Sequence, residues 1–294
     1  MTLFRPYKAG TALGGRYVVE RPLGAGSYSV AYLCFDRAEG RRVVVRHDRP
    51  GRLLARLKAG ALSPREEAEL LGRLNHPRIP RVYGLFRDRG RLHLVLEFKE
   101  GVNLEDALAE GRIALDERQS LEWLKDFAQV VRHLHERGVV HRDIRPPNII
   151  LEPSPASDAA PAQAFPYGVA HLVDFGLACP IADRPTRPPL CAKLRRGGAA
   201  EEMFFRRERH PRADLYAMGH LLLFLLYSGY EPPEGDPGNL APRGWEEELR
   251  LSERTKRLLR RLLRRDEPYG TVSDLERDLE AAIAALGKPD ASDD

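Results

Sequence analysis

Two short stretches of this sequence carry the side-chain types that phosphoryl transfer requires. Residues 141–148 read HRDIRPPN, which sets Asp143 and Asn148 five residues apart, and Asp174 follows an apolar run as the first residue of an Asp-Phe-Gly triplet. A carboxylate can accept the proton of an attacking hydroxyl, while an amide and a second carboxylate can hold a metal ion against phosphate oxygens. Either stretch alone could be a chance loop, so the hypothesis depends on the elements that position them.

Length and composition favour a globular protein of two lobes or two small domains. The chain has 294 residues, of which 43% are hydrophobic and 31% charged, as is typical of soluble proteins. The longest apolar run, residues 221–227, is too short to cross a bilayer, and the N-terminus lacks a signal-peptide pattern. A net charge of +4 does not demand a nucleic-acid partner. We expect a cytoplasmic protein with no integral membrane segment and no nucleic-acid partner.

The cysteine and lysine contents limit other interpretations. The three cysteines, Cys34, Cys179 and Cys191, are odd in number and lack the paired spacing of metal ligands, so we expect free thiols. The basic residues comprise 40 Arg and only 7 Lys. A lysine of a related protein is therefore expected to appear very often as arginine in this chain.

A glycine turn near the N-terminus lies between two predicted strands. Residues 17–23 and 31–35 have strand-like patterns, and Gly24 and Gly26 lie between them. Glycines at such a turn let backbone amides approach phosphates with no side chain in the way. An ordinary hairpin would look similar, but the strand–turn–strand order argues against a Rossmann site or a Walker loop.

The next elements are a strand that ends in a cation and a well-capped helix. Residues 41–46 form an apolar run that ends in Arg46. Ser63, Pro64 and Glu66 are an N-cap, a first-turn proline and a capping-box glutamate, and they predict a helix through Leu74.

The rest of the chain reads mainly as helices. Further strands are predicted over 81–86 and 92–98. Helical spacing of apolar residues then predicts helices over 104–110, 120–137, 252–265 and 272–286, with another apolar helix around 221–227. The Pro- and Ala-rich segment 152–168 is expected to be a surface loop insertion.

Taken in order, these motifs resemble the bacterial Hanks-type (eukaryotic-like) serine/threonine protein kinases, in a cytosolic single-domain form. The resemblance rests on HRDxxxxN, the DFG triplet, the glycine-rich loop and a DxYxxG stretch at 214–219. It covers about residues 14–286 and implies an α+β, two-lobed fold with a small β-rich N-lobe and a larger, mainly helical C-lobe. The boundaries expected are a tail at 1–13, the N-lobe at 14–98, the C-lobe at 99–286 and a disordered tail at 287–294.

The resemblance also implies a site for ATP and Mg²⁺ between the lobes. Asp143 would be the catalytic base, and Asn148 and Asp174 would hold magnesium. Arg145 stands where serine/threonine kinases carry a lysine directed at the γ-phosphate. Glu67 would pair with Arg46, although its neighbours Glu66 and Glu69 compete for that role. The residues implied to contact or frame the nucleotide are Leu23, Gly24, Gly26, Val30, Val44, Arg46, Glu67, Glu97, Lys99 and Ile150. Each apolar member of this set could equally be ordinary core.

The sequence departs from the family pattern at several positions. Arg46 and Arg145 replace lysines, Ser29 replaces the third loop glycine, and the proline of an Ala-Pro-Glu motif is missing before Glu202. The usual late arginine partner of that glutamate is not recognisable in residues 266–271.

Two hypotheses follow. The chain is an ATP- and Mg²⁺-dependent serine/threonine kinase acting on a protein substrate, or it is a pseudokinase that binds nucleotide as a scaffold or sensor with little or no transfer.

Overall fold

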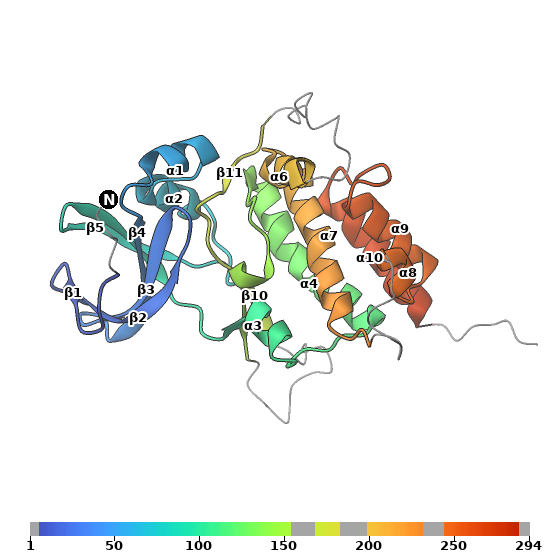
Figure 1. Cartoon of the computed structure of the whole chain (residues 1–294), viewed down its shortest axis with the longest axis horizontal. Helices are drawn as coiled ribbons and strands as arrows, with labels where there is room; N and C mark the ends of the chain where they lie inside the picture. The colour runs from blue at the N-terminus through green and yellow to red at the C-terminus, as the bar shows by residue number, and fades with distance from the viewer. Residues whose placement is uncertain (1–5, 154–167, 183–198, 232–243, 288–294) are drawn as a thin grey trace, which may run out of the picture. The chain divides into compact units, whose positions relative to one another are not determined.

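The computed structural model describes residues 6–153, 168–182, 199–231 and 244–287. The chain forms two compact units: Met1–Glu100 with His171–Cys179, and Gly101–Ala170 with Pro180–Asp294. Figure 1 shows strands gathered in the first unit and most helices in the second. The predicted order of a β-rich part followed by a mainly helical part is confirmed.

The first unit is built on a six-stranded sheet in the order β1-β2-β3-β4-β6-β5. Its strands are β1 (Ala12–Leu13), β2 (Tyr17–Ala25), β3 (Ser29–Asp36), β4 (Arg41–Asp48), β5 (Val82–Asp88) and β6 (Arg91–Glu97), and all neighbours are antiparallel. Alternate residues of the central strands are buried because successive side chains of a strand point to opposite faces. The resulting core includes Val19, Val30, Tyr32, Val43, Val45 and Val95.

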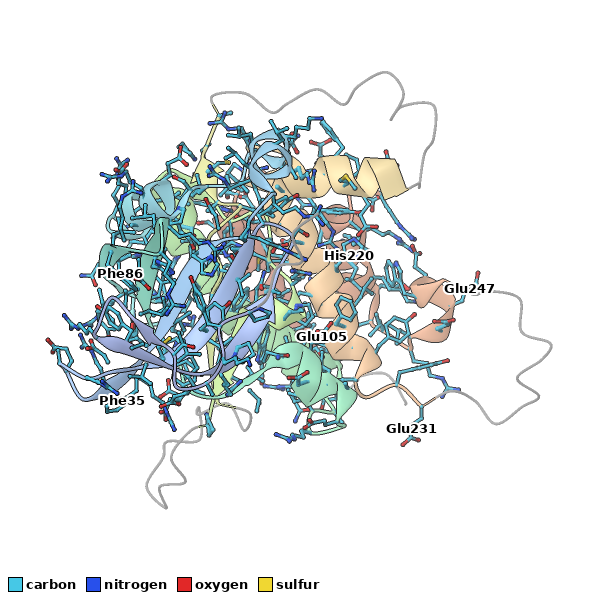
Figure 2. All side chains as sticks on the ribbon, turned by 60° about the vertical axis from the view of Figure 1, so that its left-hand side comes forward. Phe35, Phe86, Glu105, His220, Glu231 and Glu247 are labelled. Carbon is cyan, nitrogen blue, oxygen red and sulfur yellow. The ribbon has the colours of Figure 1, made fainter. Side chains whose placement is uncertain are left out.

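An aromatic cluster closes one part of this core. Phe86 of β5, labelled in Figure 2, stacks on Tyr17 and His93 at centroid distances of 5.0 and 4.8 Å. His93 is fully buried, and Tyr7 places its hydroxyl 3.4 Å from His93 Nε2. A histidine is therefore held among apolar rings.

Two helices lie among the described residues of the first unit. α2 (Pro64–Leu71) begins with the predicted capping box: Glu66 N donates to Ser63 Oγ over 3.3 Å, and Ser63 N donates to Glu66 Oε2 over 2.7 Å. The helix packs on β4, β5 and β6 with Leu70 and Leu71 buried. A shorter helix, α1 (Leu53–Ala59), precedes it where none was predicted.

The second unit is a bundle of helices. α4 (Glu117–Glu136), α7 (Arg212–Tyr227), α9 (Glu253–Leu262) and α10 (Val272–Leu286) pack against one another, as Figure 1 shows. α3 (Leu104–Ala109), α6 (Ala199–Arg207) and α8 (Trp245–Glu248) complete it. α4 begins three residues before its predicted start, because Asp116 and Gln119 form a capping box. No helix in the described ranges is long and apolar enough to cross a membrane.

Short elements surround the loop that carries Asp143. β7 (Val102–Asn103) pairs antiparallel with β9 (Ile149–Glu152), and β8 (Val139–Val140) and the 3₁₀ turn η1 (Pro146–Asn148) flank the loop. β10 (Val169–Leu172) and β11 (Cys179–Pro180) lie where the chain passes from one unit to the other.

Candidate active site

In the first unit, Arg46 lies at the centre of a polar cluster. Arg46 Nη1 donates to Glu67 Oε1 over 2.8 Å and to Asp174 Oδ1 over 2.6 Å. Arg46 Nε donates to Ser29 Oγ over 2.9 Å. The structure therefore brings together three residues expected at the nucleotide site and adds Ser29, which sequence reasoning had treated only as a missing glycine.

Burial sets the protonation of this cluster. Glu67 is 2% exposed, and its burial raises the pKa of its carboxyl to about 7 even though Arg46 opposes the shift. Burial by itself would lower the pKa of Arg46, but the carboxylates of Asp174 and Glu67 raise it above its usual value. One guanidinium is thus shared by two carboxylates, and the pKa of the buried one, Glu67, is raised.

The Asp-Phe-Gly triplet has the backbone shape that this cluster needs. Asp174 has φ of 62°, in the left-handed region that non-glycine residues rarely adopt. Gly176 N donates back to Asp174 Oδ1 over 3.2 Å. A Cβ atom at Gly176 would overlap Arg46 Nη2, so any side chain there would displace the guanidinium from its present position. Strain at such a position is typical of functional sites.

The glycine-rich turn joins β2 and β3 as a hairpin. Gly24 is opposite Ala31, and Gly26 N donates to Ser29 O over 2.9 Å. A Cβ built at Gly24 would meet no heavy atom within 4 Å, and one at Gly26 would meet only Ser29 O at 3.7 Å. The missing side chains thus leave room above this turn for a ligand to approach the backbone. Leu23, just before it, is 37% exposed.

The residues expected around the adenine lie partly in the first unit's core. Val30 is 1% exposed, whereas Val44 is half-buried on β4 opposite Leu96. Val30 is therefore as much a core residue as a candidate roof for the base.

Glu97 and Lys99 follow the end of β6. Glu97 N donates to Arg81 O over 2.8 Å, so this amide is committed to the protein. Lys99 Nζ donates to Pro77 O and to Glu97 Oε1 over 2.8 and 2.9 Å. Of the polar groups of Glu97 and Lys99, the Glu97 carbonyl and the backbone of Lys99 are the candidates for contacting a base. Ile150 belongs to the second unit, where it is half-buried on β9 opposite Asn103.

In the second unit, Asp143 is hydrogen-bonded to Asn148 and ion-paired with Arg145. Asn148 Nδ2 donates to Asp143 Oδ2 over 2.8 Å and to Asp143 O over 2.9 Å. Arg145 Nε lies 3.2 Å from Asp143 Oδ1, and its side chain is 53% exposed. The amide of Asn148 thus orients the carboxylate, while the side chain of the neighbouring arginine is half exposed to solvent.

A buried aspartate in α7 braces this loop. Asp214 accepts hydrogen bonds from His141 N at 2.9 Å, from Arg142 N at 2.8 Å and from His135 Nε2 at 2.9 Å. Burial alone would raise the pKa of Asp214, but the bonds from His135 and the loop hold it below its usual value. Arg142 has φ of 67°, so the loop is held in a shape that its own backbone does not favour.

One buried ion pair was missed by the sequence analysis. Arg264 Nη2 lies 2.7 Å from Glu208 Oε2, and their side chains are 11% and 3% exposed. Glu202, to which the sequence pointed, forms an (i, i+4) pair with Arg206. In the sequence, the arginine partner of Glu202 was sought in residues 266–271. Arg264 lies two residues before that segment, and the glutamate that it pairs with is Glu208, six residues after Glu202. The loop expected at 152–168 lies almost wholly outside the described residues.

The donor types present suit ATP and magnesium. Magnesium prefers hard oxygen ligands and is usually held by one or two carboxylates together with phosphates. Asp174 supplies a carboxylate that is 41% exposed. Asn148 turns its Nδ2 toward Asp143, which leaves Oδ1 as the acceptor end of the amide. Each unit thus carries an oxygen ligand of the kind that magnesium prefers, and the first unit also carries the Arg46 guanidinium, a donor that suits phosphates.

Comparison with known proteins identifies the family. A family model described as the protein kinase domain matches residues 17–269. The chain belongs to the protein kinase family. This kinase is 30% identical over 282 residues to the Bacillus subtilis (strain 168) protein named "Probable serine/threonine-protein kinase YbdM", a match that covers 96% of this chain and 95% of that protein. The resemblance to bacterial Hanks-type serine/threonine kinases is confirmed.

Two further comparisons place this kinase among known structures and longer relatives. The crystal structure of the PknI kinase domain from Mycobacterium tuberculosis matches it with a TM-score of 0.62 and 19% identity, over 95% of this chain and 100% of the other. That likeness shows a shared fold and confirms the predicted two-lobed α+β kinase class. The serine/threonine-protein kinase pkn2 of Myxococcus xanthus is 28% identical over 230 residues, which are 76% of this chain but 25% of that protein.

Proposed function

We propose that this kinase is an active enzyme that transfers the γ-phosphate of ATP to serine or threonine hydroxyls of a protein substrate, with magnesium. The observation that carries the proposal is the Asp143 group. A carboxylate is oriented by Asn148 and carried on a loop that Asp214 braces through two backbone amides. A scaffold that only bound nucleotide would have no use for an oriented base of this kind.

In the proposed reaction the acceptor oxygen forms a bond to the γ-phosphorus while the bond from that phosphorus to the bridging oxygen breaks, and ADP leaves. Asp143 accepts the hydroxyl proton as the bond forms. Arg145 is exposed enough to leave Asp143 and contact the transferred phosphate. Magnesium, when held by Asn148 and Asp174, would neutralise charge on the phosphate oxygens.

Arg46 has the same role in the first unit as the phosphate-binding lysine of relatives. It keeps the positive charge at a buried position beside Glu67. Its fork is planar and wider than an ammonium, so its contacts with phosphates differ in direction. In this proposal the backbone amides of the glycine turn and the Arg46 guanidinium together hold the phosphates of the nucleotide.

The experiment that tests activity is phosphate transfer from labelled ATP with magnesium, to the kinase itself and to a generic basic protein. We expect transfer by the parent chain and a loss of roughly a hundredfold or more in Asp143→Asn, because the amide cannot accept the proton. Glu105→Gln is the matched control, since Glu105 is an exposed carboxylate on α3, labelled in Figure 2. Equal transfer by the parent chain and Asp143→Asn would contradict the assigned base.

A pseudokinase is the second candidate, and one observation favours it. Each replaced lysine position holds an arginine bonded to a carboxylate expected to act in transfer: Arg46 to Asp174 and Arg145 to Asp143. Loss of one well-placed phosphate donor costs on the order of 3 kcal/mol, about a hundredfold in rate. If ATP with magnesium raises the melting temperature but no transfer is detected, this candidate replaces the first.

A further inference from the structure

The arginine at position 46 makes one contact through a donor nitrogen that lysine lacks. Arg46 Nη1 is occupied by Glu67 and Asp174, but Nε donates separately to Ser29 Oγ over 2.9 Å. A lysine ends in a single nitrogen, so it has no second donor partway along its side chain. The contact to Ser29 is therefore specific to arginine.

Strand pairing brings the two side chains together. Arg46 of β4 is directly opposite Ala31 of β3, and Ser29 lies two residues before Ala31. Residues two apart in a strand project from the same face, and diagonal neighbours across a strand pair are within reach of long side chains. Ser29 is thus a diagonal neighbour of Arg46, on the same face of the sheet.

The backbone at Ser29 gives no reason for a glycine. Ser29 is not among the described residues with positive φ, so any residue fits its conformation. The carbonyl oxygen of Ser29 accepts a hydrogen bond from Gly26 N over 2.9 Å, so the backbone of Ser29 is held at the end of the glycine turn. The side chain, rather than the backbone, therefore distinguishes serine from glycine at this position.

We propose that Ser29 is the positioning residue for Arg46, so that serine in the glycine-rich turn and arginine on β4 act as a matched pair that aims the guanidinium at the nucleotide phosphates. The proposal rests on the nucleotide site of the proposed function. Nη1 fixes one corner of the guanidinium plane and Gly176 leaves room for Nη2. The bond from Nε to Ser29 fixes the remaining direction, so the plane cannot turn about Nη1.

A double-mutant cycle tests the pairing. The variants are Ser29→Ala, Arg46→Lys and the two combined, with Ser29→Thr as the conservative variant that keeps the hydroxyl. For each, the dissociation constant for ATP with magnesium is measured by titration calorimetry. We expect Ser29→Ala to weaken binding roughly threefold to tenfold, the range of one hydrogen bond. In the Arg46→Lys background the same change should have no further effect, and Ser29→Thr should bind as the parent does.

The same cycle is measured in urea unfolding without nucleotide. The two single changes should again couple, because the bond is present in the protein before any ligand binds. Equal effects of Ser29→Ala in the Arg46 and Arg46→Lys backgrounds, in both measurements, would overturn the proposal, since the hydroxyl would then act independently of Arg46.

The outcomes separate this inference from the proposed function. ATP binding with a coupled cycle but no phosphate transfer would overturn the active-kinase proposal and leave the pairing intact. Phosphate transfer together with an additive double-mutant cycle would overturn the pairing of Ser29 with Arg46 and support the active-kinase proposal. If the parent chain binds no ATP, both fail, because Arg46 would then have no phosphate to be aimed at.

Discussion

At position 46 a single guanidinium satisfies a serine hydroxyl and two carboxylates. The two carboxylates differ in exposure: Glu67 is 2% exposed and Asp174 41% exposed. Desolvation disfavours the charged form of the more buried acid, which is why the pKa of Glu67 rises while it is still bonded to Arg46. The protonation of Glu67 is therefore linked to the stability of the first unit.

Replacing Glu67 with glutamine should change how stability depends on pH. Between pH 4.5, the ordinary value, and about 7 the native protein holds a proton on Glu67 that the unfolded chain has released. Stability therefore falls as pH rises through this window, by on the order of 3 kcal/mol for this group. Glu67→Gln removes that loss. The unfolding free energy of the variant should therefore increase relative to that of the parent chain as pH rises. Urea unfolding at intervals from pH 4.5 to 7.5 measures this.

The neighbouring Glu66 is the control for this measurement. Its pKa is lowered, chiefly by the hydrogen bond with Ser63, so its contribution to stability is lost as pH falls. Because that loss lies below the ordinary value of 4.5, Glu66→Gln should leave the pH profile between pH 4.5 and 7.5 essentially unchanged. If both variants shift the profile alike, the burial assigned to Glu67 does not control its protonation.

At the scale of elements, close helix packing holds the loop that carries Asp143. α7 carries Asp214, and its other side lies against α9 at Gly219. A Cβ at Gly219 would lie 2.8 Å from Leu262 Cβ and 3.1 Å from Leu263 Cδ2. The small residue thus lets the two helix backbones approach.

Helix α1 was not predicted because seven residues are too few for apolar periodicity to be distinctive.

Gly219→Ala should destabilise the kinase by about 1–3 kcal/mol, because the added methyl group overfills the α7–α9 contact. Chemical denaturation measures the loss. Gly270→Ala is the matched control, since a Cβ there would meet only Asp274 Oδ2 at an ordinary 3.8 Å. Equal stability of the two variants would show that the helices can separate without cost.

At the scale of the whole molecule, each unit has its own core and at least one histidine whose pKa burial lowers. Burial lowers the pKa of His93 in the first unit and of His220, labelled on α7 in Figure 2, to about 4. Neutral imidazoles of this kind resist protonation in the native state but gain a proton once the chain unfolds. Acid should therefore destabilise both units.

His93→Phe should reduce the acid sensitivity of the kinase. Below the ordinary value of 6.5 and down to about 4, the unfolded chain binds a proton that the native site excludes, so stability is lost as pH falls. The share of one such histidine is on the order of 2 kcal/mol. A phenyl ring can stack on Phe86 as His93 does. Urea unfolding at pH 7 and pH 5 should show a smaller difference for the variant, and an unchanged difference would contradict the assignment.

The sequence by itself determined the family, the order of a β-rich part and a helical part, and the capping box of α2. These depend on local patterns: motifs of three to eight residues, side-chain periodicity and capping residues within four positions of one another. Asp143 and Asn148 lie on one loop, so their spacing of five residues was enough to predict that they lie close together.

Only the tertiary structure decided which distant residues meet. Arg46 and Asp174 are separated by 128 positions, and Glu208 and Arg264 by 56. Ser29 looked like a lost glycine until strand register placed its hydroxyl on Arg46. Such contacts follow from how strands pair and helices pack, which no local pattern encodes, because their stabilisation comes from burial that exists only once the chain has folded.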